Sequence, residues 1–158
     1  AVLVPIWLRP SGARLILTKR ASHLKHHPGQ IAFPGGKVDA TDASPEAAAL
    51  REAWEEIGLL PNQVELLGRL PAHETVTGFS MQPIVGLIKD DFAATPELGE
   101  VEEVFSVPLS HVLNPARFVI EGRVWKNQPR RYYAVPYGPY YIWGATARIL
   151  RGLAERAV

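Results

Sequence analysis

The sequence contains no cysteine in its 158 residues. Disulfide bonds, thiolate zinc sites, iron–sulfur clusters and a cysteine nucleophile are therefore excluded. Charge of one sign is not in excess either, because 17 lysine and arginine residues accompany 16 aspartate and glutamate residues. A nearly neutral chain has no strong basis for attracting nucleic acid, and we expect no nucleic-acid partner.

Long hydrophobic runs are missing as well. The longest begins at Ala1, contains Pro5 and ends at Leu8, far short of the roughly 20 residues that a membrane-spanning helix needs. We find no signal-peptide pattern, although the chain begins with Ala1 rather than methionine. We therefore expect a soluble, cytoplasmic protein with no membrane partner.

The remaining composition is that of one ordinary folded domain. Hydrophobic residues make up 47% of the chain. A chain of this length buries roughly 70% of the surface that it exposes when unfolded. We find no internal repeat, low-complexity tract or linker-like change in composition, so we expect a single domain over residues 1–158.

Segments typical of strands outnumber segments typical of helices. Helical periodicity is present in Pro45–Ile57 and in 145–157, whereas 100–112 is ambiguous. Strands interrupted by a central and a terminal helix predict an α/β or α+β fold, with a mixed sheet covered by helices. Apolar, β-branched or aromatic runs predict the strands at 2–8, 14–18, 64–70, 82–88, 117–125 and 131–135.

The helix expected at Pro45–Ile57 has clear signals at both ends. Ser44 and Pro45 occupy the N-cap and first-turn positions, and Gly58 follows as a C-terminal cap. At about 3.6 residues per turn, this helix has an apolar face and an opposite acidic face. We expect the apolar face to contain Ala47, Leu50, Trp54 and Ile57, and the acidic face to contain Glu52, Glu55 and Glu56.

An ordinary solvent-exposed face explains these three glutamates poorly. Glu52 and Glu56 are like charges at i and i+4, which costs about 0.2–0.5 kcal/mol. Glu55 and Glu56 also lie at the negative end of the helix dipole, where lysine is favoured. Arg51 can pair with Glu55 but leaves two carboxylates unpaired. Magnesium prefers carboxylate oxygens beside substrate phosphates, so the helix predicts a metal site.

A basic, glycine-containing segment precedes this helix. Residues 17–36 contain three glycines and two prolines, which predict turns. Gly35 and Gly36 lack a Cβ and can bring the backbone close to a ligand, although a plain turn explains them equally well. Positive charge ahead of an acidic helix suits a metal–phosphate complex, and a histidine zinc site is the alternative. The basic residues are Lys19, Arg20 and Lys25, and the histidines are His23, His26 and His27.

Residues 36–59 read GKVDATDASPEAAALREAWEEIGL. This segment resembles the signature of the Nudix hydrolase family. Asp42 stands where the family has glutamate, eight residues instead of seven separate Asp42 from Arg51, and Ala53 replaces a bulky apolar residue. These departures affect the loop and one flank of the helix but leave the three glutamates in place. The matching positions are Arg51, Glu52, Glu55, Glu56, Gly58 and Leu59.

A second pattern lies upstream and resembles the additional signature of the coenzyme A pyrophosphatase branch of that family. Lys25 stands where this signature has arginine, which keeps the charge but loses the bidentate guanidinium fork. Residues 142–147, IWGATA, also resemble this branch. The pattern consists of Ile16-Leu17-Thr18, Arg20-Ala21, Lys25, Gly29 and Phe33-Pro34-Gly35-Gly36.

The resemblance implies a Nudix-type α/β/α sandwich with a mixed β-sheet between helices. It also implies an enzyme that splits the diphosphate of coenzyme A into 3′,5′-ADP and 4′-phosphopantetheine. The alternatives are a Nudix hydrolase of ADP-ribose, dinucleotides or oxidised nucleotides, and a non-catalytic module that binds nucleotide or RNA. We expect a small-molecule substrate as partner, and the oligomeric state stays open.

Residue roles follow from the glutamates and from the resemblance together. We expect Mg²⁺ or Mn²⁺ to bind Glu52, Glu55 and Glu56, and Arg51 to orient a glutamate. The expected catalytic residues are Glu52, Arg51 and Glu55. The expected substrate-binding residues are Lys19, Arg20 and Lys25, for the 3′-phosphate, together with Gly35 and Gly36. The candidates for the general base are Glu52, Glu97, Glu100, Glu102 and Glu103.

Overall fold

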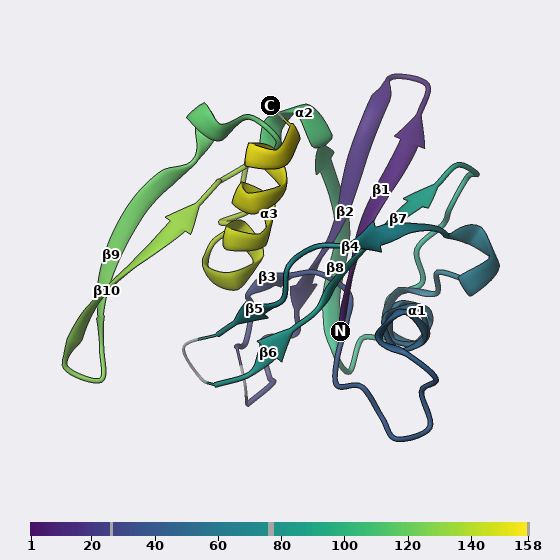
Figure 1. Cartoon of the computed structure of the whole chain (residues 1–158), viewed down its shortest axis with the longest axis horizontal. Coiled ribbons are helices and arrows are strands. Elements are labelled where there is room, and N and C mark those ends of the chain that lie inside the picture. The colour runs from purple at the N-terminus through teal and green to yellow at the C-terminus, as the bar shows by residue number, and fades with distance from the viewer. Residues whose placement is uncertain (26, 76–77, 158) are drawn as a thin grey trace.

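A six-stranded mixed β-sheet forms the centre of the molecule (Figure 1). The computed structural model describes residues 1–25, 27–75 and 78–157. Strands β1 and β7 are parallel neighbours, whereas the other pairings in this sheet are antiparallel. The strand order is β3-β2-β1-β7-β4, and β8 pairs with β2 along most of its length. The strands are β1 (Val2–Arg9), β2 (Gly12–Arg20), β3 (Ile31–Ala32), β4 (Glu65–Arg69), β7 (Pro83–Ile88) and β8 (Val101–Pro108).

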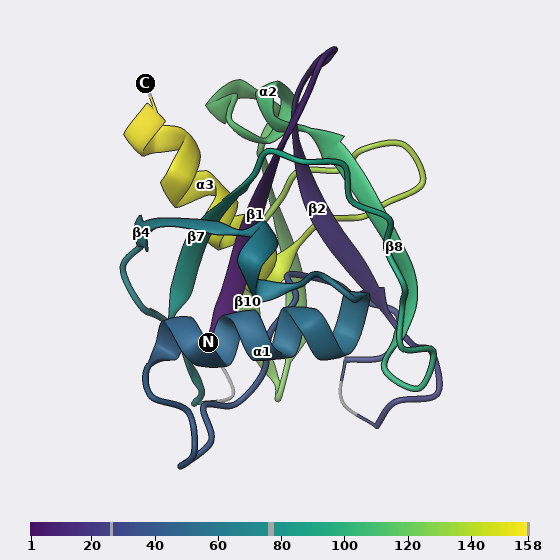
Figure 2. The ribbon, with the colours of Figure 1, turned by 90° about the vertical axis from the view of Figure 1, so that its right-hand side faces the viewer.

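Two long helices cover opposite faces of this sheet, α1 (Pro45–Ile57) and α3 (Gly144–Ala157) (Figures 1 and 2). Side chains along a strand alternate between faces, and the strands here are apolar on both. In β1, Leu3 packs with α1, whereas Val2 and Val4 belong to the cluster that includes α3. The strands β1, β2 and β7 at the centre of the sheet are therefore buried between two helical layers, whereas the edge strand β4 is exposed. Shorter helical turns are α2 (Leu109–Val112), η1 (Pro61–Gln63) and η2 (Pro115–Arg117).

Helix α1 begins and ends where the sequence predicts. The Ser44 hydroxyl accepts a hydrogen bond from the Ala47 amide at 3.1 Å, and Gly58 has a φ of 74°. That left-handed conformation suits glycine because it has no Cβ.

The apolar face predicted for α1 is correct at Ile57 and wrong at Trp54. Ile57 is fully buried against the sheet as predicted, whereas Trp54 is 54% exposed. Ala49 and Ala53, which were not expected on this face, are also fully buried. The small alanines let the helix lie close to the strands, and this rotates Glu56 toward the interior. The inward face of α1 is therefore part apolar and part acidic.

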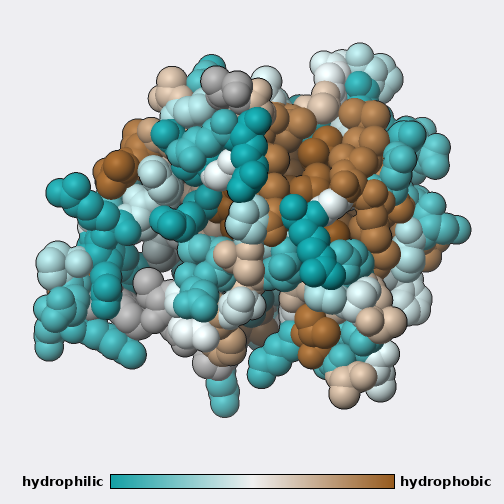
Figure 3. All heavy atoms as spheres, in the orientation of Figure 1, coloured by the Kyte–Doolittle hydropathy of each residue, from teal (hydrophilic) through white to brown (hydrophobic). Residues whose placement is uncertain are grey.

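A hairpin projects beside α3 and consists of β9 (Val119–Trp125) and β10 (Gln128–Ala134) (Figure 1). Its turn contains Lys126 and Asn127 with φ of 50° and 61°, the positive values that a tight hairpin requires. The hairpin is mostly hydrophilic on the face shown in Figure 3, whereas hydrophobic atoms gather to the right of α3. A smaller hairpin pairs β5 (His73–Glu74) with β6 (Ser80–Met81).

The predicted mixed sheet between helices is confirmed. All six predicted strands and both predicted helices are present, and the ambiguous segment 100–112 is strand β8 followed by α2. The two-residue strands β3, β5 and β6 were not predicted, because so short a segment has no periodicity to detect. Among the described residues, no helix has the length and apolar character needed to span a membrane.

A pair of glycine substitutions tests the close packing of the sheet. A Cβ on Gly86 in β7 would lie 2.6 Å from Val64 Cγ1 and 3.0 Å from Leu3 Cδ1. We expect Gly86→Ala to lower the free energy of unfolding by about 1–3 kcal/mol through overpacking. Gly152 in α3 has open space around it, so Gly152→Ala should raise that free energy by about 0.5–1 kcal/mol. Denaturant unfolding measures both, and equal effects would contradict the packing described.

Candidate active site

Three glutamates converge at the edge of helix α1. Glu52 and Glu56 lie one turn apart on the helix, and Glu100 comes from the loop before β8. One carboxylate oxygen from each of the three lies within 4.8 Å of the others. We call Glu52, Glu56 and Glu100 the glutamate cluster.

Glu56 is the buried member of the glutamate cluster, with only 6% of its surface exposed. Its Oε2 accepts a hydrogen bond from the Gly35 amide at 2.7 Å. Burial raises the pKa of Glu56 to about 8, although the Gly35 hydrogen bond acts in the opposite direction. Its carboxyl therefore favours the neutral form at pH 7 unless a cation approaches.

Gly36 provides the space for Glu52. A Cβ on Gly36 would lie 2.6 Å from Glu52 Oε1, closer than packed atoms allow. Burial raises the pKa of Glu52, and the charge of Arg51 opposes this shift. The two glycines therefore contact the two helical members of the cluster, Gly35 through its amide and Gly36 through close packing.

The loop that carries Glu100 is tied to the end of α1 by backbone hydrogen bonds. The amide of Thr95 donates to the Ile57 carbonyl at 2.9 Å, and the amide of Glu97 donates to the Glu56 carbonyl at 2.8 Å. The amide of Ala21 donates to the Glu100 carbonyl at 3.0 Å. The first two bonds satisfy carbonyls that the helix end leaves unpaired, and the bond from Ala21 ties Glu100 to the residue after β2.

The structure distinguishes among the four candidates for the general base that lie outside helix α1, namely Glu97, Glu100, Glu102 and Glu103. Glu100 alone of these four belongs to the glutamate cluster. Glu97 is exposed and accepts a hydrogen bond from the Gly99 amide at 3.1 Å. Glu102 pairs with Lys19 at 3.2 Å, and Glu103 accepts a hydrogen bond from the Tyr140 hydroxyl.

Arg51 is the centre of an ionic network on the outer side of the glutamate cluster. Its Nε and Nη2 donate to both carboxylate oxygens of Asp42, at 3.0 and 3.1 Å. Its Nη1 donates to Glu52 and Glu55, both at 3.2 Å. The Asp42 side chain is 6% exposed, and its hydrogen bonds with Arg51 lower its pKa. Asp42 therefore holds Arg51 in place, a role that its type and spacing did not reveal.

Glu55 is placed differently from the other predicted metal ligands. Its side chain is 50% exposed and pairs with Arg51, and it does not belong to the glutamate cluster. The helix turns by about 100° per residue, so burying Glu56 directs Glu55 outward. The role of Glu55 as a metal ligand stays a prediction. Glu100, which the sequence indicated only as a candidate general base, belongs to the cluster instead.

The predicted basic residues lie at different depths. Arg20 is partly buried, and its charge favours ionisation of Glu56. Lys19 is partly exposed and paired with Glu102, and Lys25 is exposed. His26 lies outside the described residues. Among the residues that are described, the group suited to a metal contains three glutamates and no histidine, which disfavours the zinc alternative.

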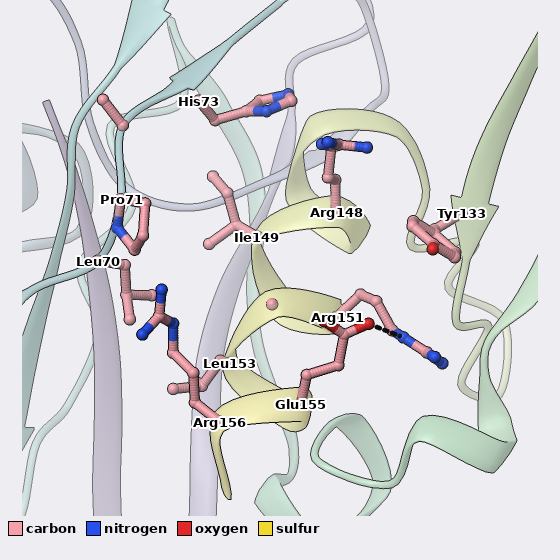
Figure 4. Close-up of a pocket in the computed structure, with 12 residues that line it drawn as sticks. Leu70, Pro71, His73, Tyr133, Arg148, Ile149, Arg151, Leu153, Glu155 and Arg156 are labelled. Atoms are coloured by element: carbon pink, nitrogen blue, oxygen red, sulfur yellow. Dashed lines mark hydrogen bonds and ion pairs between the residues drawn. The ribbon is translucent and has the colours of Figure 1, made fainter.

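A groove of about 270 Å³ lies apart from the glutamate cluster, along α3 (Figure 4). His73, Arg148, Arg151 and Arg156 line it, and Arg151 is paired with Glu155 at 2.9 Å. Burial, with a contribution from Arg148, lowers the pKa of His73. None of its lining residues belongs to the glutamate cluster, so this groove is not the candidate active site.

The glutamate cluster fits a hard divalent cation. Its donors are carboxylate oxygens from three residues, and such oxygens are the preferred ligands of Mg²⁺ and the related Mn²⁺. Placing a buried carboxylate near two others is unfavourable without a neighbouring positive charge. The site therefore has both the ligands and the electrostatic need for a cation.

Comparison with known proteins finds similarity to the Nudix family. The family model described as the NUDIX domain matches residues 1–127. The Nudix hydrolase NudL of Enterobacter sp. (strain 638) is 47% identical over 154 residues, which span 98% of this chain and 80% of the relative. NudL of Salmonella newport (strain SL254) is 46% identical over the same lengths.

Solved structures share the fold. The NUDIX domain of Shewanella oneidensis NrtR, crystallised with ADP ribose, has a TM-score of 0.61 and 17% identity, with 99% of this chain and 86% of that chain covered. The Nudix hydrolase RenU of M. smegmatis has a TM-score of 0.59 and 23% identity, with 70% of each chain covered. Such low identities establish the architecture only.

The buried carboxyl of Glu56 predicts a pH-dependent stability when divalent cations are removed by a chelator. Its pKa of about 8 in the folded chain exceeds the ordinary value of 4.5. The stabilisation that it contributes is therefore complete below pH 4.5 and is lost as the pH rises through 8. Glu56→Gln keeps a neutral group at this position and should unfold at a higher temperature than the wild type at pH 9, but not at pH 4. Thermal unfolding measures the difference.

The control for this measurement is Glu74→Gln, which changes an exposed carboxylate that does not belong to the cluster. It should follow the wild-type pH profile. A constant difference between Glu56→Gln and the wild type from pH 4 to pH 9 would contradict a raised pKa at Glu56.

Proposed function

The chain belongs to the Nudix family, and from that premise we propose that this Nudix hydrolase splits the diphosphate of coenzyme A. The products would be 3′,5′-ADP and 4′-phosphopantetheine, and coenzyme A derivatives would be cleaved at the same linkage. The coarser assignment, hydrolysis of a nucleoside diphosphate derivative, follows from the family and from the named relatives.

The observation that carries the proposal is the contact between the two sequence motifs. The upstream motif ends at Gly35 and Gly36, and the downstream motif supplies Glu52 and Glu56. The 2.7 Å hydrogen bond from Gly35 to Glu56 joins the motifs at one point. The motif that resembles the coenzyme A branch is therefore part of the wall of the glutamate cluster.

Each set of residues has a distinct task in this proposal. Glu52, Glu56 and Glu100 would hold Mg²⁺ or Mn²⁺. When bound, such an ion neutralises diphosphate oxygens and lowers the pKa of water. Arg51, held by Asp42, keeps the Glu52 carboxylate in position.

Proton transfer involves members of the glutamate cluster, and phosphate binding involves the basic segment before Gly35. Glu52 and Glu100 are the carboxylates best placed to take a proton from the attacking water, since both belong to the cluster. Lys19, Arg20 and Lys25 supply positive charge on the segment that leads to Gly35, which suits the 3′-phosphate of coenzyme A. Glu55 stays a proposed metal ligand and catalytic residue. In this structure it accepts a hydrogen bond from Arg51.

Product analysis tests the proposed reaction. We expect coenzyme A with Mg²⁺ or Mn²⁺ to yield 3′,5′-ADP and 4′-phosphopantetheine, and a chelator to abolish the reaction. Glu52→Gln should lower kcat by about 10²-fold or more, because a metal ligand is lost. Glu74→Gln, an exposed control, should leave kcat unchanged.

A substrate panel gives the outcomes that would contradict the proposal. Faster hydrolysis of ADP-ribose, dinucleotides or oxidised nucleotides than of coenzyme A would transfer the assignment to another Nudix substrate. Binding of nucleotide or RNA without metal-dependent turnover would favour a non-catalytic module.

The 3′-phosphate contact has its own test. Lys25→Ala should raise KM for coenzyme A by about 5-fold or more and change KM for dephospho-coenzyme A by less than about 2-fold, because a charge-assisted contact is lost only with the former. Lys89→Ala, which changes an exposed lysine that pairs with Glu65 and has no proposed role in binding, serves as the control. Equal changes for both substrates in Lys25→Ala would remove Lys25 from the phosphate site.

A further inference from the structure

A second hollow, of about 480 Å³, is lined in part by Lys19 of β2 and Glu103 of β8. It lies where the end of β2, the loop before β3, strand β8 and the segment before α3 meet. We call it the aromatic cavity because three rings line it. The residues used in the argument are Lys19, Gln30, Glu103, Tyr140, Tyr141 and Trp143.

Tyr140 is the most firmly held of these rings. Phe105 stacks on one face, with ring centroids 3.6 Å apart and planes inclined by 4°. The Tyr140 hydroxyl donates a hydrogen bond to the Glu103 carboxylate. Backbone hydrogen bonds between Tyr137 and Tyr140, of 2.9 and 3.0 Å, close the turn that carries the ring. Tyr140 lines the cavity, and the contacts with Phe105 and Glu103 hold its ring in one position.

The neighbouring aromatic wall is formed with the projecting hairpin. Tyr132 lies 4.9 Å from Trp143 between ring centroids, and its hydroxyl is 3.1 Å from that of Tyr141. The guanidinium carbon of Arg123 lies 5.2 Å from the centre of the Trp143 ring. Aromatic side chains ordered before a ligand arrives lose little conformational entropy on binding it.

The aromatic cavity and the glutamate cluster share one pair of strands. In the register of strands β2 and β8, Lys19 lies opposite Glu103. Arg20 lies opposite Val101, the residue after Glu100. Glu103 lies three residues beyond Glu100, which corresponds to about 10 Å of extended chain. A ligand with a diphosphate at one end and a ring system at the other can therefore reach both sites.

From these observations, we infer that the aromatic cavity binds the adenine base of the substrate by stacking it on Tyr140. This inference rests on the proposed function and adds an orientation, with the nucleotide half over β2–β8 and the pantetheine half directed away from it. Aromatic rings bind bases through their flat faces. Gln30 can donate to and accept from a base edge, and Lys19 adds positive charge for the phosphorylated ribose.

Calorimetric binding of the two reaction products tests the orientation. The probes are 3′,5′-ADP, which contains the base, and 4′-phosphopantetheine, which does not. Tyr140→Leu should weaken 3′,5′-ADP about 5- to 150-fold and change 4′-phosphopantetheine by less than about 2-fold, because only the base stacks. Tyr140→Phe keeps the ring and should bind 3′,5′-ADP within about 3-fold of the wild type. Phe79→Leu removes an exposed ring outside the cavity and serves as the control.

Tryptophan emission provides a second measurement that does not require removal of Tyr140. 3′,5′-ADP should change the emission of the wild type, and Trp143→Phe should abolish most of that change while the other tryptophans stay. An unchanged signal in Trp143→Phe, or equal weakening of both products by Tyr140→Leu, would overturn the inference.

The two proposals fail in different ways. If coenzyme A is hydrolysed and Tyr140→Leu leaves its KM unchanged, the base does not bind in the aromatic cavity, although the proposed reaction stands. If coenzyme A is not hydrolysed but 3′,5′-ADP binds in a Tyr140-dependent manner, the cavity is a base site and the substrate is another nucleotide.

Discussion

The hydrogen bond between the Gly35 amide and the buried Glu56 carboxylate is the contact on which the site depends. It joins the glycine turn after β3 to the inward face of α1. A buried carboxyl group needs a donor, and without one it costs far more than an ordinary lost hydrogen bond. Gly36 then approaches Glu52 so closely that any Cβ would collide with it. One short loop thereby places two carboxylates and excludes larger side chains from the space between them.

The charges around the glutamate cluster are balanced from outside it. Arg51 lies between Asp42, Glu52 and Glu55, so the acidic helix carries its own counter-charge. The last turn of α1 has no basic residue, yet its carbonyls are not left unpaired. Main-chain amides of the 95–97 segment bind the carbonyls of Ile57 and Glu56 instead. The hydrogen bonds that satisfy these carbonyls also hold the loop that carries Glu100 beside the helix.

Much of the architecture could be predicted from local patterns. Two of the three members of the glutamate cluster, Glu52 and Glu56, were also expected as metal ligands. The limits of α1 were predicted because Ser44, Pro45 and Gly58 act within one turn of the chain. The orientation of α1 was not, since hydrophobicity alone directs Trp54 inward, whereas packing selects Ala49 and Ala53. Asp42 departs from the family signature in type and spacing, yet both of its carboxylate oxygens accept hydrogen bonds from Arg51.

The sequence by itself determined the longer helices and most of the longer strands, the acidic helix, the glycine turn and the family, because each is encoded in residues that are near one another in the chain. The tertiary structure decided which acids meet. Glu100 is 44 positions from Glu56 and joins it only through loop hydrogen bonds, while Glu55, adjacent to Glu56, points outward. Tyr140 likewise reaches Phe105 and Glu103 only when β8 and the segment before α3 are folded together. Contacts of this kind depend on the relative placement of distant segments, which burial and backbone pairing set and local sequence does not.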